Sequence, residues 1–193
     1  MGSAFVVGIT GHRDLKLECL DYYREQLFAL LVTLKARHTN VLIYSPLSDG
    51  ADRLIVKEGI KLDIPFVAVL PMLKEQYIRD FERDSREEFN ALLGLAQGTI
   101  TIPLCQDNTL ADITYYSSQR DKQYEACGHF IAKNCKTLVA LWDGKDIGLV
   151  GGTGEIVKFY LTQKNAVLQN LSVSRSSDTN NVKVKFNKIE NVD

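Results

Sequence analysis

The sequence has no excess of charge of either sign. Its 193 residues include 23 lysines and arginines against 24 aspartates and glutamates, which gives a formal net charge of -1. Surfaces that bind nucleic acid are normally basic, because lysine and arginine neutralise the phosphates. The composition therefore predicts no DNA or RNA partner, although a small pocket for an anion stays compatible with it.

Long apolar runs and a targeting segment are also missing. No apolar run approaches the roughly 20 residues that a membrane-spanning helix needs. The N-terminus shows no charged stretch followed by an apolar stretch and a cleavage site, so no signal peptide is predicted. From these absences we expect a cytoplasmic protein.

Cysteine is scarce and lacks metal-binding spacing. The four cysteines form no CxxC pair and are not spaced with the three histidines as metal ligands are. This pattern predicts reduced thiols and no metal site. The dinucleotide fingerprint GxGxxG is absent as well, since Arg13 and Asp14 stand where its later glycines would be. No motif requires a cofactor.

Short apolar runs alternate with longer amphipathic segments over most of the chain. The runs show little polar alternation, which is typical of strands buried on both faces of a parallel sheet. The expected strands are 4–9, 41–44, 64–70, 99–102 and 136–141, and the expected helices are 20–34, 51–62, 74–96, 119–134 and one after Gly154. This order predicts an α/β fold with a Rossmann-like, open, mostly parallel sheet and helices on both faces.

The length suits one domain, with a boundary expected near residue 165. Residues 1–165 would form a nucleotide-binding domain if the loops described below bind a ligand. After Leu161 the chain turns polar, so residues 166–193 are predicted to be a polar tail or linker. Within it, Val182, Val184 and Phe186 alternate with lysines and predict one edge strand.

Glycine and polar residues gather where the expected strands end. The carboxyl ends of parallel strands meet at one edge of a sheet, and ligands of open α/β sheets bind there. We therefore expect one ligand site made by several loops. The candidate binding residues are Gly11, His12, Arg13, Ser45, Ser48, Asp49, Gly50, Asp52, Trp142, Asp143, Gly151, Gly152, Thr153, Gly154 and Glu155.

The glycine-rich stretch 151–155 predicts the start of a helix. Backbone N–H groups at such a start, together with the helix dipole, can hold a phosphate, and glycine permits its close approach. Alone, the stretch is equally compatible with a tight turn. Glu155 fits either the helix dipole or a carboxylate that acts on a glycosidic carbon.

The loop after the first strand offers two candidate ligand groups. The guanidinium of Arg13 suits a phosphate or carboxylate, with an ion pair to Asp14 or Asp49 as its alternative. His12 could bond to a ligand or act as an acid, or it could be structural.

The loop after the second strand precedes a helix. Ser48 or Asp49 could cap that helix, and Gly50 would let a ligand approach its start. Asp49 and Asp52 would oppose a phosphate there, so as acceptors they suit ribose hydroxyls better.

Aromatic residues could line a base. Trp142, the only tryptophan, could pack in the core or stack on a base, and Tyr77 is a second candidate. The neighbouring Asp143 could orient a hydroxyl or cap the next turn.

Three motifs together resemble the SLOG superfamily, the Rossmann-like group named for the SMF/DprA and LOG proteins. They are GITGHRD at 8–14, SPLSDGADRL at 45–54, and LWDG at 141–144 with GGTGEIV at 151–157. The likeness is greatest to the bacterial sensor-like branch, whose members recognise nucleotide derivatives, NAD-derived ones included, in signalling and antiviral defence. The resemblance implies a nucleotide-derived small molecule, an effector or membrane partner in a longer chain or complex, and a homo-oligomer.

The chain departs from LOG-type phosphoribohydrolases at their glycine motif. Those enzymes carry PGGxGTxxE, whereas this chain has VGGTGE at 150–155, without the proline and with a displaced glutamate. The departure argues against nucleosidase activity and leaves phosphate binding in place.

The main hypothesis is a module that binds and senses an ADP-ribose-, NAD- or cyclic-nucleotide-like molecule. The alternative is an N-glycosidic-bond hydrolase or transferase, either a nucleotide 5′-monophosphate nucleosidase or a deoxyribosyltransferase-like enzyme. Glu155 would then be catalytic, with Asp49 or His12 assisting. A third hypothesis is an interaction module with a vestigial pocket.

Overall fold

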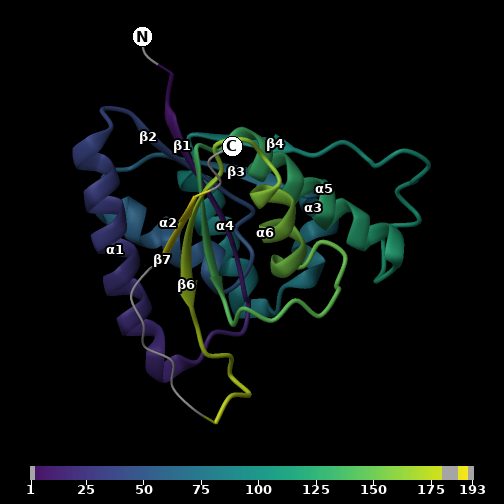
Figure 1. The fold of residues 1–193 in the computed structure, drawn as a ribbon. Coiled ribbons are helices and arrows are strands. Elements are labelled where there is room, and N and C mark those ends of the chain that lie inside the picture. The colour runs from purple at the N-terminus through teal and green to yellow at the C-terminus, as the bar shows by residue number, and fades with distance from the viewer. Residues whose placement is uncertain (1–2, 180–186, 191–193) are drawn as a thin grey trace.

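A seven-stranded sheet forms the centre of the molecule (Figure 1) in a computed structural model that describes residues 3–179 and 187–190. The strands are β1 (Phe5–Gly11), β2 (Val41–Ser45), β3 (Phe66–Leu70), β4 (Gly98–Thr101), β5 (Thr137–Trp142), β6 (Val167–Ser172) and β7 (Asn187–Glu190). Their order is β4-β3-β2-β1-β5-β6-β7, and all pairs are parallel except β6 with β7. The predicted α/β fold with a mostly parallel sheet is confirmed.

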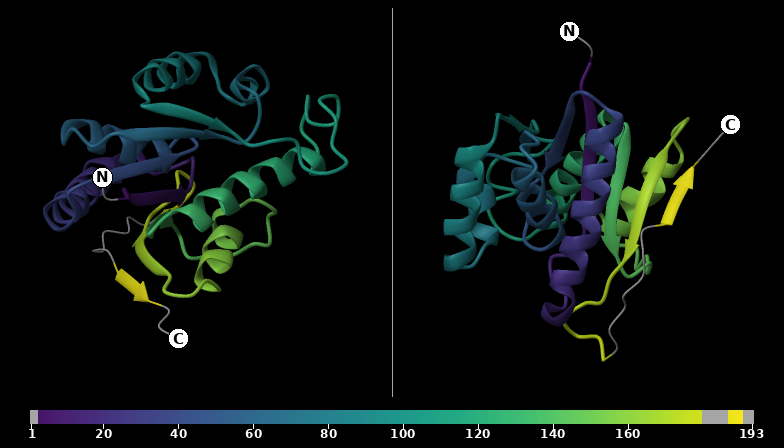
Figure 2. Two further views of the ribbon diagram at one scale, coloured as in Figure 1. Left: turned by 90° about the horizontal axis from the view of Figure 1, so that it is seen from above. Right: turned by 90° about the vertical axis from the view of Figure 1, so that its left-hand side faces the viewer.

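Helices cover both faces of this sheet (Figure 2). They are α1 (Leu20–Arg37), α2 (Ala51–Lys61), α3 (Lys74–Tyr77), α4 (Arg83–Leu95), α5 (Ser118–Asn134) and α6 (Thr153–Leu161), with 3-10 turns η1 (Leu17–Cys19) and η2 (Ile78–Asp80). One hydrophobic cluster joins α1, α2 and α4 to the sheet, and a second joins α5 and α6 to its other face. No helix in the described ranges is long and apolar enough to cross a membrane.

The charged segment 74–96, expected to be helical, is interrupted by an aromatic cluster. Phe81 is 2% exposed and has extended backbone, which separates η2 from α4. Its ring centroid lies 4.9 Å from that of Tyr77 and 5.1 Å from that of Phe89. Packing of these rings fixes α3 beside the end of β3, where Tyr77 can face the sheet edge.

The sheet continues beyond the boundary expected at residue 165. Strand β6 pairs in parallel with β5, and its Leu168 and Leu171 are buried. Residues 167–172 are therefore part of the core and not of a polar tail. The expected edge strand at 182–186 lies outside the described residues, while β7 begins at Asn187.

Strand β1 marks the switch point of the sheet. It pairs with β2 on one side and β5 on the other, and the helices that follow β1 and β5 cover opposite faces. The loops at the carboxyl ends of β1 and β5 consequently diverge and leave a crevice between them.

Gly50 allows α2 to begin directly against the loop after β1. Its φ is +72°, and a Cβ there would lie 2.4 Å from the carbonyl oxygen of His12 and 2.5 Å from that of Arg13. The amide of Ala51 donates to the same His12 oxygen at 3.1 Å. Gly50 thus serves the contact between two loops of the protein.

We expect Gly50→Ala to lower the free energy of unfolding by about 2–4 kcal/mol, since it combines an unfavourable φ with a clash. Gly144→Ala is the matched control, because Gly144 also has a positive φ but has no atom within 4 Å of the added Cβ. Its loss should be only about 1 kcal/mol. Urea denaturation measures both, and equal losses would contradict the close approach at Gly50.

Candidate functional site

His12 links three loops at the crevice. Its amide donates to Leu141 at 2.9 Å, and its carbonyl accepts from Ala51. Its Nε2 lies 3.1 Å from both the amide nitrogen and Oδ1 of Asp143. Although burial raises the pKa of Asp143, the amide of Lys145 and the His12 ring outweigh it, and the net shift is downward. These contacts are those expected of the structural alternative for His12. The residue also lines the cavity between the loops after β1 and β5, so the ligand-binding alternative stays a prediction.

Three cavities adjoin one another around Arg13 and Gly151, which line all three. The inner cavity, of about 100 Å³, lies among β1, α2, α3, α5 and α6. The outer cavity, of about 300 Å³, lies between the loops after β1 and β5. The side hollow, of about 430 Å³, opens between α5 and the loop before α6. Pockets for small ligands commonly have volumes of 300 Å³ or more.

Two-thirds of the predicted residues line the inner or outer cavity. They are Gly11, His12, Arg13, Ser48, Asp52, Asp143, Gly151, Gly152, Thr153 and Gly154. The structure thus brings together parts of all the loops that the sequence placed at one sheet edge.

The guanidinium of Arg13 has no hydrogen bond or ion pair with any described residue. It lies 5.4 Å from the ring centroid of Tyr124. The two carboxylates considered as its partners are occupied: Asp14 bonds to Arg175 at 3.0 Å and Asp49 to Arg53 at 2.8 Å. Arg13 is therefore available to an anion.

The carboxylates of the outer cavity are already compensated. Asp14 pairs with Arg175, Asp143 contacts His12, and Asp146 pairs with Lys158. Hydrogen bonding to Lys158 and to the amide of Gly148 also lowers the pKa of Asp146. Arg13 has no such ion pair with a described residue, and its positive charge acts on Asp52 of the neighbouring inner cavity, where it opposes the rise in the pKa of that carboxyl.

The start of α6 contributes backbone donors. Gly152 is the N-cap, without a side-chain cap, and its carbonyl accepts from Ile156 at 3.1 Å. Within the described chain, the amides of Thr153, Gly154 and Glu155 have no acceptor, as is usual in a first helical turn. These amides can donate hydrogen bonds to an anion.

Two glycines of this stretch serve packing. Gly151 has a φ of +70°, and a Cβ there would lie 2.7 Å from the amide nitrogen of Glu125 on α5. A Cβ on Gly154 would lie 2.9 Å from the Cβ of Asp146. The glycines thus bring the α6 start close to α5 and to its own preceding loop.

Asp52 is the buried carboxyl of the inner cavity. Burial raises its pKa to about 7, although Arg13 and the amide of Ser48 act in the opposite direction. The hydroxyls of Ser48 and Tyr77 line the same cavity and lie close enough to interact with each other, and neither has another hydrogen-bond partner among the described residues. Burial also raises the pKa of Tyr77 and of Cys127, so both are neutral at pH 7. The inner cavity therefore holds polar groups with unused bonding capacity.

Ser45, Asp49 and Gly50, predicted to touch a ligand, build the β2–α2 turn instead. The Ser45 hydroxyl donates to the carbonyl of Asp52 and accepts from the amide of Leu47, both at 3.1 Å. Asp49 accepts from the Ser85 hydroxyl and pairs with Arg53. Gly50, and neither Ser48 nor Asp49, occupies the N-cap of α2.

Trp142 and Glu155 also lie away from the three cavities. The indole N–H of Trp142 donates to Asn170 of β6 at 2.6 Å, and its ring packs against the hydrophobic cluster under α5 and α6. Glu155 Oε1 lies 2.7 Å from Nε2 of His129 on α5. Base stacking on Trp142 and catalysis by Glu155 are therefore not favoured by their positions.

Several lining residues were not among the predicted ligand-binding residues. Tyr124 and Cys127 were expected to face inward on α5. That periodicity could have indicated that they line the inner cavity. Gly128 lets α6 approach, since a Cβ there would lie 2.2 Å from Ile156. Arg175 enters the outer cavity because the segment after β6 folds back onto Asp14, and no sequence pattern indicated this.

Comparison with known proteins gives a likeness of fold. No family model and no curated protein matches the sequence. Two solved chains match, and one is the X-ray structure of DNA processing protein A (DprA) from Streptococcus pneumoniae, with a TM-score of 0.53 and 11% identity. The match covers 86% of this chain and 50% of that chain, so this chain spans about half of its length. The likeness shows that this chain shares a Rossmann-like fold with DprA.

The raised pKa of Asp52 predicts how stability depends on pH. Between about pH 4 and pH 7 the unfolded state loses this proton while the folded state retains it, so Asp52 makes wild-type stability fall as pH rises through about 7. Asp52→Asn removes this dependence of stability on pH. Its stability relative to wild type should improve by on the order of 3 kcal/mol from about pH 4 to pH 8. Urea denaturation at both pH values tests this, and a constant difference would contradict it.

Proposed function

We propose that this chain binds a phosphorylated nucleoside derivative of the ADP-ribose, NAD or cyclic-nucleotide type. The observation that carries the proposal is the guanidinium of Arg13, which has no ion pair with a described residue and lines the outer cavity together with the uncapped start of α6. A cation and backbone amides of a helix start are complementary to phosphate. The adjoining inner cavity supports a ligand that also carries hydroxyls.

The phosphate would lie in the outer cavity. Arg13 would form charge-assisted hydrogen bonds with it, and the amides of Thr153 and Gly154, which line the same cavity, would donate to it as well. The neighbouring carboxylates are each compensated within the protein, so they oppose the phosphate less than isolated charges would.

The ribose would face the inner cavity. Asp52, Ser48 and Tyr77 offer a carboxyl and two hydroxyls there, and buried groups of this kind favour a partner that supplies their missing hydrogen bonds. In this proposal Asp52 accepts from ribose hydroxyls, as the sequence predicted. Asp49, for which the same role was predicted, is not included because it pairs with Arg53.

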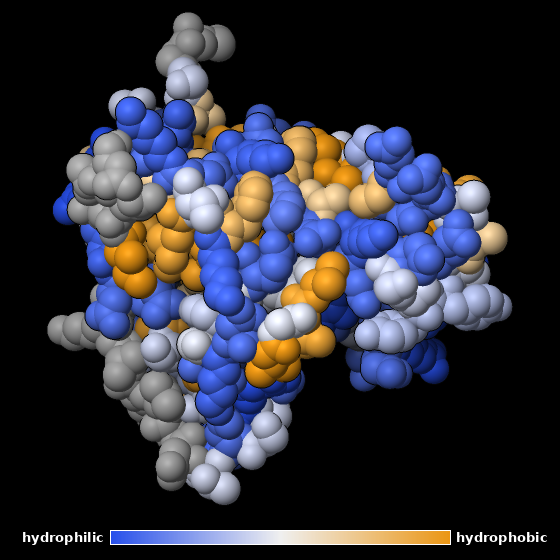
Figure 3. Space-filling model, turned by 45° about the vertical axis from the view of Figure 1, so that its right-hand side comes forward, coloured by the Kyte–Doolittle hydropathy of each residue, from blue (hydrophilic) through white to orange (hydrophobic). Residues whose placement is uncertain are grey.

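The base would extend toward the side hollow. Tyr116 is 86% exposed there, and Leu149 and Val150 are 59% and 51% exposed. In Figure 3, hydrophobic side chains reach the surface beside a hollow on this side of the molecule. An exposed aromatic ring with apolar neighbours suits the face of a base.

We expect Arg13→Gln to weaken binding of ADP-ribose by about 10- to 100-fold, since hydrogen bonds to charged groups are worth 1.5–3 kcal/mol. Calorimetric titration with ADP-ribose, AMP and adenosine measures this, and adenosine should bind least because it lacks phosphate. Arg83→Gln is the matched control, since Arg83 is an exposed arginine of α4 that lines none of the three cavities.

Two results, the second from the same titration with a single-stranded oligonucleotide, would overturn the proposal. One is the absence of binding by folded protein at millimolar nucleotide, which would favour an interaction module with a vestigial pocket. The other is tight, Arg13-dependent binding of a single-stranded oligonucleotide, which would favour a DNA-related role like the one in the name of the DprA relative.

Cleavage of an N-glycosidic bond is the second candidate function, and Asp52 favours it. A carboxyl with a pKa of about 7 inside a cavity can act as a general acid or base near neutral pH. In this version Asp52 replaces Glu155 as the catalytic group, because Glu155 lines none of the cavities.

The enzyme hypothesis predicts a contrast between these two carboxyl groups. If wild type releases free base from nucleoside 5′-monophosphates, Asp52→Asn should slow release by about 100-fold or more, the usual contribution of a general acid or base. Glu155→Gln should retain the rate within a few-fold. Chromatography of released base measures both, and loss confined to Glu155→Gln would restore Glu155 as the catalytic residue.

A further inference from the structure

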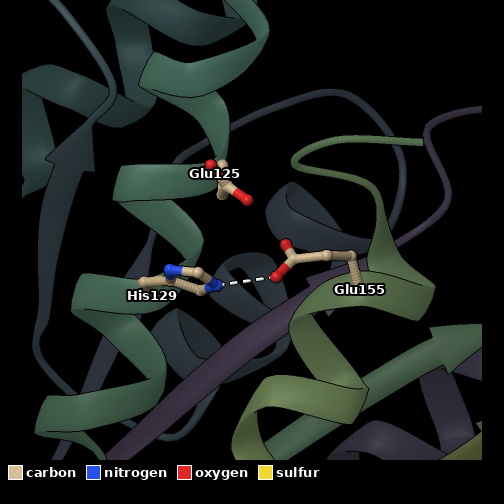
Figure 4. A group of neighbouring side chains, drawn as sticks. All are labelled: Glu125, His129 and Glu155. Carbon is tan, nitrogen blue, oxygen red and sulfur yellow. Dashed lines mark hydrogen bonds and ion pairs between the residues drawn. The ribbon is translucent and has the colours of Figure 1, made fainter. Parts of the chain in front are cut away.

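Glu125, His129 and Glu155 form a cluster between α5 and α6, outside the three cavities (Figure 4). Each offers one ligand atom, and these atoms all lie within 4.8 Å of one another. The cluster combines an imidazole with two carboxylates, the set of donors that proteins use for transition-metal ions.

Helix geometry brings the three side chains together. Glu125 and His129 are four residues apart on α5 and therefore share one face of that helix. Glu155 comes from the first turn of α6, which packs against α5. The His129 ring stacks on Phe159 with centroids 3.7 Å apart, and this orients its Nε2 toward Glu155 Oε1 at 2.7 Å.

Both carboxylates have unused coordinating capacity. Glu155 Oε2 is buried and has no hydrogen-bond partner among the residues that the structure describes. Within the described residues, the Glu125 side chain makes no hydrogen bond or ion pair, and neither glutamate is paired with a lysine or arginine. The nearby lysines have other contacts, since Lys158 pairs with Asp146 and Lys133 lies over the Phe159 ring. A buried carboxylate oxygen without a partner, such as Glu155 Oε2, favours a cation.

We propose that Glu125, His129 and Glu155 bind a divalent transition-metal ion, of which Zn²⁺ is the probe. His129 would supply its Nε2, and each glutamate would supply an oxygen. One nitrogen and two oxygens make three ligands, as in open zinc sites whose fourth position holds water. The sequence pattern of cysteines and histidines predicted no metal site, because one of these ligands lies on a different helix and two are glutamates.

The site would connect α5 with the first turn of α6. Both helices also line the inner cavity, through Tyr124 and Cys127 on α5 and Thr153 on α6. The metal proposal nevertheless stands apart from nucleotide binding, since none of the three ligands lines a cavity. Failure of either proposal leaves the other intact.

Calorimetric titration of chelator-treated, full-length protein with ZnCl₂ tests the site. We expect one equivalent to bind and the melting temperature to rise with Zn²⁺, because an ion that binds only the folded state stabilises it. Glu125→Gln and His129→Ala should weaken binding by more than the 10- to 100-fold typical of losing an outer-shell partner. Glu125→Gln is the sharper variant, because Glu125 has no structural bond to lose.

Two controls separate this site from other zinc ligands. Glu87→Gln removes an exposed carboxylate of α4, and Cys105→Ser removes a partly exposed thiol; both should bind Zn²⁺ as wild type does. Circular dichroism shows that each variant is folded. The proposal is overturned if folded wild type binds no Zn²⁺, if Glu125→Gln and His129→Ala bind like wild type, or if only Cys105→Ser loses binding.

Discussion

The site depends on the hydrogen bonds that His12 makes across the switch point of the sheet. Its amide binds the end of β5, its carbonyl binds the start of α2, and its ring contacts Asp143. Divergent loops at a switch point would otherwise separate, because no strand pairing holds them beyond the sheet edge. His12 thereby fixes the position of the next residue, Arg13, whose side chain lines all three cavities.

The charge pattern around Arg13 explains why a nearly neutral protein can still carry an anion site. Net charge describes the whole surface, whereas binding depends on which charges lack a partner locally. Around the outer cavity, Asp14, Asp143 and Asp146 each contact a basic residue of the protein. Arg13, by contrast, makes no ion pair with an acidic residue in the described part of the chain. The amides at the start of α6 add further positive potential without a formal charge.

Burial gives different properties to two carboxyl groups that the sequence presents alike. Both Asp52 and Glu155 lie in the first turn of a helix that follows a strand. Asp52 is enclosed by the inner cavity and its pKa rises to about 7, while Glu155 lies beside His129 on α5. The proposals therefore assign them different partners, ligand hydroxyls or a transferred proton for Asp52 and a cation for Glu155.

The sequence by itself determined the alternation of strands and helices and the loops that share one sheet edge, because hydrophobic periodicity is a property of neighbouring residues. It missed β6, whose polar residues conceal a buried strand, and it could not tell where Trp142 and Glu155 would point. Those directions depend on contacts between distant residues, such as Asp143 with His12 and Arg175 with Asp14, which are 131 and 161 positions apart. Only the tertiary structure brings such pairs together. These long-range contacts therefore decided which of the predicted residues line a cavity.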